Sequence, residues 1–427
     1  MCAKEIAVTL PLLAQTPDSA ALSAWDVLHD YGLVFVMALV VSVVATPLFA
    51  RIARALGVVD HRDDRGGQRR EVACLGGLAI LVGWLVAVVV GAKLHLIGTP
   101  GMAGPIRGIV LGALVVVAVG LLDDLVGLSP LRKIAGQLAA AFVMMGFGHV
   151  GTDILVTSWP FESRPDPAVL SVASIVLSIA VVAGVCNAAN LLDGLDGLCS
   201  GATVIIVSTL VVISVSLTME GRDIVYDPTR MIVGLAILGA VIGFVPYNYN
   251  PASILMGNAG SMLLGFIAAA MILLLGERVP TQRYFWAALV VMGLPAFDLL
   301  LALFRRLTTG RGFFTPDAYH LHHQLIRQGL TVRQAVSVLY LLLMVFAAMG
   351  LLMVRTRLRY SVIVLLVLGF NLVLITLSFR LHRPGSPSRV TDESVARLPR
   401  SIDAQLVEES ADSDAEEQPA NKDGSSL

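Results

Sequence analysis

Residues 187–201 read NAANLLDGLDGLCSG, and this polar stretch interrupts an otherwise apolar sequence. An Asp at the centre of a membrane helix costs about 2.5 to 3.5 kcal/mol, so Asp193 and Asp196 must face water, a metal ion or a substrate. Their i, i+3 spacing predicts that they share one helical face with Asn190. The stretch therefore predicts a cluster of oxygen ligands. A polar turn between two helices, with Asp and Asn as caps, remains an alternative.

The composition is that of a polytopic membrane protein. The chain has 427 residues, of which 56% are hydrophobic and 14% charged, and its mean hydropathy is +0.81. These values exclude an ordinary soluble globular protein. Nucleic-acid binding is not indicated, because the arginines are scattered and no long basic run occurs. The chain has four cysteines, Cys2, Cys74, Cys186 and Cys199. Their spacing is not that of a metal site or of a disulfide framework, so they are predicted to be packing residues.

Apolar runs long enough to cross about 30 Å of hydrocarbon recur along the chain. They lie near residues 31–50, 75–92, 106–122, 134–149, 169–187, 199–217, 231–247, 259–276, 285–304, 334–354 and 360–380. The predicted fold is all-α, with about eleven transmembrane helices. No motif recurs at a fixed period, so the repeats common in transporters are not indicated. The predicted organisation is an external segment at 1–30, a transmembrane domain at 31–382 and a disordered acidic cytoplasmic tail at 383–427.

The arginine distribution predicts the orientation of the chain. The connection at 51–74 carries six arginines and that at 305–333 carries five, which favours a cytoplasmic location for both. The N-terminus is then outside and the C-terminus inside. All the polar clusters fall on the connections predicted to be cytoplasmic: 51–74, 123–133, 188–198, 248–258 and 305–333.

The second cluster reads GLLDDLVGLSPLRKIAGQ, at residues 120–137. Asp123 and Asp124 are adjacent carboxylates, and such a pair persists most easily beside a cation, for which Lys133 is the candidate. Neighbouring residues point to different faces of a helix, so the two acids can serve different roles. A polar helix end without function is the alternative.

Two further clusters carry groups suited to anions. The stretch PYNYNPASILMGNAGSMLLG, at residues 246–265, contains a glycine-rich helix start whose N–H groups at 257–261 would point at an anion. The stretch FFTPDAYHLHHQLIRQGL, at 313–330, brings three histidines near arginines. Zinc is disfavoured there because the i, i+4 spacing of zinc-binding helices is missing. Imidazole and guanidinium groups together suit a diphosphate.

Together, and in this order, the acid pair, NAANLLDGLDGL, NYNPASILMGNAGS and HLHH resemble the polyprenyl-phosphate N-acetylhexosamine-1-phosphate transferases of glycosyltransferase family 4. These enzymes are related to phospho-N-acetylmuramoyl-pentapeptide transferase. The resemblance extends from about Arg51 to about Gly329, and the HLHH form with the preceding FDLLLALFRR is more similar to the N-acetylhexosamine branch.

The resemblance implies transfer of a sugar 1-phosphate, expected to be GlcNAc 1-phosphate, from a UDP-N-acetylhexosamine to polyprenyl phosphate in the membrane. UMP would be released and Mg²⁺ required. The expected site faces the cytoplasm at a bacterial inner membrane, and a homodimer is a possible assembly. By position, the implied roles are catalysis by Asp123 and Asp124, phosphate binding by Lys133, metal binding by Asn190 and Asn258, and donor binding by Asp193, Asp196, Asn248 (to uracil), His320, His322 and His323.

Two departures from the family pattern leave alternatives open. Asn258 stands where the family carries a metal-binding Asp. The first connection, VDHRDDRGGQRREVACLGG, keeps Gly76 and Gly77 but lacks the prolines of the family pattern and the histidine that the family carries within it. A catalytically inactive relative acting as a membrane scaffold is therefore one alternative. A lipid or solute transporter is the other, because transporters also place polar residues at broken helices.

Overall fold

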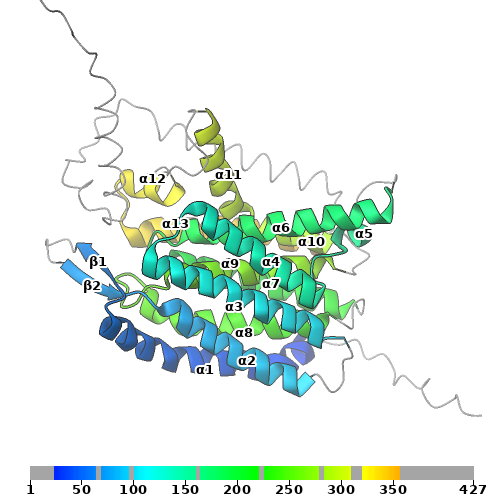
Figure 1. The fold of residues 1–427 in the computed structure, drawn as a ribbon, viewed down its shortest axis with the longest axis horizontal. Helices are drawn as coiled ribbons and strands as arrows, with labels where there is room; N and C mark the ends of the chain where they lie inside the picture. Colours follow the sequence, from blue (N-terminus) through cyan, green and yellow to red (C-terminus); the bar gives the residue numbers. More distant parts are fainter. Residues whose placement is uncertain are drawn as a thin grey trace, which may run out of the picture.

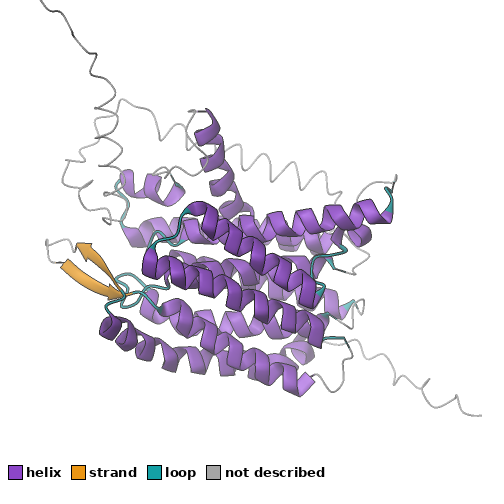
Figure 2. Ribbon diagram, in the orientation of Figure 1, coloured by secondary structure: helices purple, strands orange, loops and turns teal. Residues whose placement is uncertain are grey.

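The computed structural model describes residues 24–63, 69–95, 101–159, 164–220, 226–277, 283–308 and 320–355. The described part is a helical bundle with one small hairpin (Figure 2). Its elements are α1 (Ala24–Leu56), β1 (Val59–Asp63), β2 (Arg69–Ala73), α2 (Gly76–His95), α3 (Ala103–Val126), α4 (Pro130–Gly148), α5 (Ile154–Ser158), α6 (Pro167–Leu192), α7 (Leu198–Met219), α8 (Asp227–Asn248), α9 (Gly257–Gly276), α10 (Arg283–Val291), α11 (Gly293–Thr308), α12 (Leu321–Arg327) and α13 (Val332–Arg355).

The all-α polytopic fold predicted from the sequence is confirmed. Within the described residues, 8 helices are long and apolar enough to cross a membrane, or 9 if the bent pair α10 and α11 forms one span. The predicted span at 134–149 falls mostly in α4, which is not among them and carries the charged residues Arg132 and Lys133 in its first turn. The predicted span at 360–380 lies outside the described residues, as does the tail at 383–427. The number eleven therefore stays a prediction.

The predicted span at 285–304 is not a single straight helix, because the chain bends by 65° between α10 and α11, and its crossing of the membrane stays a prediction. Pro295 has no N–H to continue the ladder of α10, and it is tolerated in the first turn of α11. At Gly293 a Cβ would lie 2.3 Å from the Phe346 ring of α13, so the bend is packed tightly in place. In Figure 1, α11 leaves the bundle across the direction of its neighbours.

Helix α9 lies at the centre of the bundle, and every residue of its 18-residue apolar stretch is buried inside the protein. Small residues let its neighbours approach closely. A Cβ on Gly77 of α2 would come within 2.3 Å of the Gly260 nitrogen, and one on Gly120 of α3 within 2.5 Å of the Ala259 Cα. The start of α9 is thus held between α2 and α3, which fixes the position of Asn258.

A hairpin precedes α2, where the sequence predicted only a connection. Strands β1 and β2 are antiparallel, with Val59 opposite Ala73. The hairpin docks on the segment before α9: the Leu255 nitrogen donates to the Ala73 oxygen at 2.8 Å, and the Gly76 nitrogen donates to the Leu255 oxygen at 2.9 Å. Figure 1 shows the hairpin and α12 at the same end of the bundle. This end also carries the polar clusters.

The opposite end of the bundle is closed by buried polar groups. Arg230 is fully buried, pairs with Asp227 and donates from Nη1 to the Leu274 oxygen at 2.7 Å, near the end of α9. Glu277 accepts from the Gly151 nitrogen at 2.9 Å. These contacts satisfy backbone groups that a helix end would otherwise leave unpaired in an apolar environment.

Candidate functional site

The acid pair ends α3, and its two carboxylates face different helices. Asp123 is 6% exposed, and its Oδ2 lies 2.7 Å from Lys133 Nζ at the start of α4. Its Oδ1 accepts from the Leu128 nitrogen at 2.8 Å. Between the helices, Gly127 adopts a φ of 64°, which favours glycine. The expected cation beside the acid pair is therefore present.

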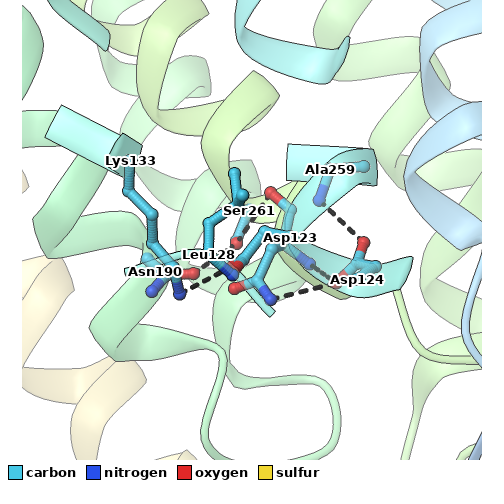
Figure 3. Close-up of polar contacts among 8 residues, drawn as sticks. Asp123, Asp124, Leu128, Lys133, Asn190, Ala259 and Ser261 are labelled. Atoms are coloured by element: carbon cyan, nitrogen blue, oxygen red, sulfur yellow. Dashed lines mark hydrogen bonds and ion pairs between the residues drawn. The ribbon is translucent and has the colours of Figure 1, made fainter. Parts of the chain in front are cut away.

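Asp124 points the other way, to the start of α9 (Figure 3). Its Oδ1 accepts from the Asn258 backbone nitrogen at 2.8 Å and from Asn258 Nδ2 at 3.0 Å, and its Oδ2 accepts from the Ala259 nitrogen at 3.1 Å. At Gly257, where φ is 70°, a Cβ would lie 2.6 Å from Asp124 Oδ2. The anion predicted at this glycine-rich helix start is thus supplied by the protein itself.

Both predicted metal ligands contact Ser261, Asn190 through its side chain and Asn258 through its backbone. The Ser261 hydroxyl lies 3.0 Å from Asn190 Oδ1 and 3.4 Å from the backbone oxygen of Asn258. Asn190 comes from the last turn of α6, while Asn258 and Ser261 come from the first turns of α9. Figure 3 shows Asn190 and Ser261 on the side of the acid pair that faces Lys133.

The oxygen donors of this site suit Mg²⁺ in their chemistry. Within the described residues, no group of three acidic, histidine or cysteine side chains has the arrangement of a metal site. Mg²⁺ does not require such a group, because it keeps several waters and is usually held by one or two carboxylates and by substrate phosphates. An Asn carbonyl oxygen has two lone pairs, so Asn190 can accept from Ser261 and still offer a lone pair.

The predicted helical face shared by Asn190, Asp193 and Asp196 is wrong. Helix α6 ends at Leu192, and residues 193–197 form a turn before α7. Gly197, directly before α7, adopts a φ of 80°, which favours glycine. Asp196 Oδ2 accepts from Asn250 Nδ2 at 3.0 Å and from the Ala252 nitrogen at 3.1 Å. Asp196 therefore ties this turn to the segment between α8 and α9.

Asn248 joins the same two segments from inside the bundle. Its side chain is 2% exposed. Its Oδ1 accepts from Ser200 Oγ at 2.8 Å and from the Gly197 nitrogen at 3.2 Å, and its Nδ2 donates to the Ile254 oxygen at 3.1 Å. The polar atoms of the Asn248 side chain thus have protein partners. Its predicted contact with uracil stays a prediction.

The histidine segment meets the turn at 193–197, although the two are far apart in sequence. His322 is 3% exposed, and a Cβ on Gly194 would lie 2.4 Å from its Nε2. Burial, with the neighbouring His323 and His320, holds the pKa of His322 well below its usual value. The rings of His322 and His323 lie 4.1 Å apart. Residues 309–319 lie outside the described residues.

Three residues of the site were missed by reasoning from sequence. Asp298 of α11 lies 3.2 Å from the His320 Nδ1, and its only signal was an acid within the apolar run FDLLLALFRR. On α13, Arg333 Nη2 donates to the Asn250 oxygen at 2.9 Å, and the Tyr340 hydroxyl donates to the Gly197 oxygen. Nothing in the local sequence distinguishes these two from ordinary helix residues.

Comparison with known proteins identifies the family. Residues 106–276 match the sequence pattern described as glycosyl transferase family 4. The chain is 33% identical, over 328 residues, to the decaprenyl-phosphate N-acetylglucosaminephosphotransferase of Mycobacterium tuberculosis, covering 74% of this chain and 80% of that protein. The chain belongs to glycosyl transferase family 4. The resemblance seen in the sequence is thereby confirmed.

Other relatives of this family 4 member span two branches. It is 30% identical to the probable undecaprenyl-phosphate N-acetylglucosaminyl 1-phosphate transferase of Bacillus subtilis, covering 78% of this chain and 88% of that protein. It is 31% identical to the phospho-N-acetylmuramoyl-pentapeptide-transferase of Desulforamulus reducens, covering 75% and 93%. The family match at 106–276 runs from α3 to the end of α9 and so includes the acid pair.

Proposed function

We propose that this protein transfers GlcNAc 1-phosphate from UDP-GlcNAc to a polyprenyl phosphate and releases UMP. The proposal rests on one observation in this member of the family: the two carboxylates of the acid pair have different partners. Asp123 faces Lys133, while Asp124 is held at the start of α9. Two of the relatives compared above are named as a decaprenyl-phosphate N-acetylglucosaminephosphotransferase and as a probable undecaprenyl-phosphate N-acetylglucosaminyl 1-phosphate transferase. The reaction forms a bond from a lipid phosphate oxygen to the sugar-bearing phosphorus and breaks that phosphorus's bond to UMP.

Asp123 and Lys133 suit the acceptor half of this reaction. A carboxylate within reach of the lipid phosphate can accept its remaining proton, which makes the attacking oxygen more nucleophilic. The Lys133 ammonium, 2.7 Å from Asp123, can neutralise charge on the same phosphate. Phosphoryl transfer asks mainly for such positioning and charge neutralisation.

Exposed apolar side chains beside the acid pair support a lipid acceptor. Leu122, Leu125 and Val126 on α3 and Leu131 on α4 are all more than half exposed in the isolated chain. Apolar side chains of this kind are stable in contact with hydrocarbon. A polyprenyl tail can therefore stay in the membrane while its phosphate reaches Asp123.

Mg²⁺ is part of the proposal, with Asn190 and Asn258 as its ligands beside the acid pair. The ion would neutralise charge on the diphosphate of the donor. The histidines and the turn at 193–197 form the proposed donor side, since His322 lies against Gly194. We place this end of the bundle at the cytoplasmic face of a bacterial plasma membrane, where UDP-sugars are available, on the strength of the arginine distribution.

The test uses the full chain purified in lipid nanodiscs with undecaprenyl phosphate and labelled UDP-GlcNAc. The expected result is a labelled lipid and one UMP for each sugar transferred, and UDP-GalNAc in a parallel reaction measures donor selectivity. A protein that binds UDP-GlcNAc but forms neither product would support the inactive relative. Movement of lipid across vesicles without UMP release would support the transporter.

A further inference from the structure

Asp298 is an acid buried in an apolar helix, and neither of its oxygens faces water. Its side chain lies in the second turn of α11 and the residue is 3% exposed. Oδ2 lies 3.2 Å from Nδ1 of His320, and Oδ1 accepts from the Leu321 nitrogen at 3.1 Å. Burial of a carboxylate is costly unless it is paired, so an acid kept here calls for a specific role.

The contact with His320 decides which ring nitrogen serves a ligand. A carboxylate that accepts from Nδ1 requires a proton on that nitrogen. Nε2 is then the ring nitrogen that can contact a ligand. The same carboxylate allows a ring protonated at both nitrogens, which is the form that donates from Nε2 to a phosphate oxygen. Carboxylate–histidine pairs orient histidine ligands in this way in other proteins.

The second contact of Asp298 holds the whole histidine segment. By accepting from the Leu321 nitrogen, Oδ1 ties the first turn of α12 to α11. From there His322 reaches the turn at 193–197, where its ring lies against Gly194. The 65° bend between α10 and α11, packed on Phe346 at Gly293, lies one turn before Asp298 on α11. Asp298 thus connects the bend to the predicted donor side.

We propose that Asp298 is a positioning residue that fixes the His320 ring with Nε2 directed to the diphosphate of the nucleotide-sugar donor. The inference rests on the proposed function, because it takes the histidine segment as the donor side of the site. Asp298 acts through His320 and does not itself touch the donor.

The experiment compares the wild type, Asp298→Asn, His320→Gln and the double variant in nanodiscs. Asn can still accept from the Leu321 nitrogen, but its amide group would donate to Nδ1 and prevent a doubly protonated ring. Loss of one charge-assisted hydrogen bond predicts a KM for UDP-GlcNAc that is about tenfold higher, with the KM for undecaprenyl phosphate unchanged. In the His320→Gln background, Asp298→Asn is expected to cause no further rise, because the two residues act as one unit.

Asp227→Asn is the matched control, since it also removes a buried carboxylate from an ion pair but at the opposite end of the bundle. It should lower Tm and leave both KM values unchanged. The inference is overturned if Asp298→Asn raises the two KM values equally, adds fully to His320→Gln, or only lowers Tm. If the wild type forms no product, the proposed function fails. Calorimetric binding of UDP-GlcNAc to the wild type and to Asp298→Asn then decides the role of Asp298 separately.

Discussion

Asp124 Oδ1 accepts two hydrogen bonds from Asn258, one from its backbone nitrogen at 2.8 Å and one from its side-chain Nδ2 at 3.0 Å. The carboxamide therefore faces the carboxylate as a donor at the position where the sequence resemblance leads one to expect an Asp. This contact holds Asp124 at the start of α9. Substitution of Asn258 therefore tests directly whether this position affects the Mg²⁺ requirement.

Asn258→Asp should couple the stability of the protein to Mg²⁺. The new carboxylate would face Asp124, and like charges at hydrogen-bond distance repel unless a cation lies between them. We expect Tm in EDTA to fall below that of the wild type, Mg²⁺ to restore it, and half-maximal activity to need several-fold less Mg²⁺. Asn258→Ala, which removes the hydrogen bond without adding charge, should show no Mg²⁺-dependent Tm. An unchanged or higher Mg²⁺ requirement in Asn258→Asp would remove position 258 from the metal ligands.

Asp123→Asn and Asp124→Asn should each lower kcat by about a hundredfold to ten-thousandfold, the range typical of a lost general base. Both should also lower Tm. Asp123→Asn removes the buried charge that pairs with Lys133, and Asp124→Asn weakens the capping of α9 at Asn258 and Ala259, which is worth roughly 0.5–2 kcal/mol. Turnover of labelled UDP-GlcNAc and thermal unfolding measure the two effects. Near-normal turnover in both variants would remove the acid pair from catalysis.

The stability of the protein should fall as the pH drops below 6.5, in part because of His322. Burial holds its pKa in the fold well below the usual 6.5. The unfolded chain takes up a proton below pH 6.5 while the folded chain does not, so the free energy of unfolding decreases as the pH falls toward the lowered pKa. Thermal unfolding between about pH 7 and pH 5 should show a shallower slope for His322→Gln. His29→Gln, which removes an exposed histidine on α1, is the control for loss of a histidine elsewhere.

Gly77→Ala should destabilise the bundle, because its Cβ would come within 2.3 Å of the Gly260 nitrogen of α9. Overpacking of this kind costs about 1–3 kcal/mol, and it would also displace the helix that carries Asn258. We expect a lower Tm and lower activity. Gly146→Ala, with no atom within 4 Å of its added Cβ, is the matched control and should leave both unchanged or slightly raise Tm. Equal Tm values in the two variants would contradict the close approach of α2 and α9.

The orientation of the chain can be tested with single cysteines in a variant that lacks the native ones. Arg327→Cys lies at the end with the polar clusters, and Thr152→Cys lies near the opposite end beside Gly151 and Glu277. An impermeant thiol reagent applied to intact cells should label position 152 only, and both positions after lysis. Labelling at 327 in intact cells would reverse the proposed topology.

Much of the fold could be predicted from the sequence because the bilayer imposes simple rules. A run of about 20 apolar residues must form a helix, since its backbone groups find no other partners in hydrocarbon. Such reasoning failed where the interruption was short. Gly293 and Pro295 lie within one apolar run, and the 65° bend between α10 and α11 is seen only in the structure, where Gly293 packs against Phe346.

The sequence by itself determined that the polar clusters lie at helix ends and which side chains they contain, because a carboxylate is too costly in lipid to lie anywhere else. The tertiary structure alone decided how those side chains are paired. Asp123 and Asp124 are neighbours in sequence, yet one pairs with Lys133 and the other with Asn258, 134 residues away. Such partners are chosen by the packing of α3 between α4 and α9. The same holds for Asp298, whose partner His320 lies 22 residues away in the sequence.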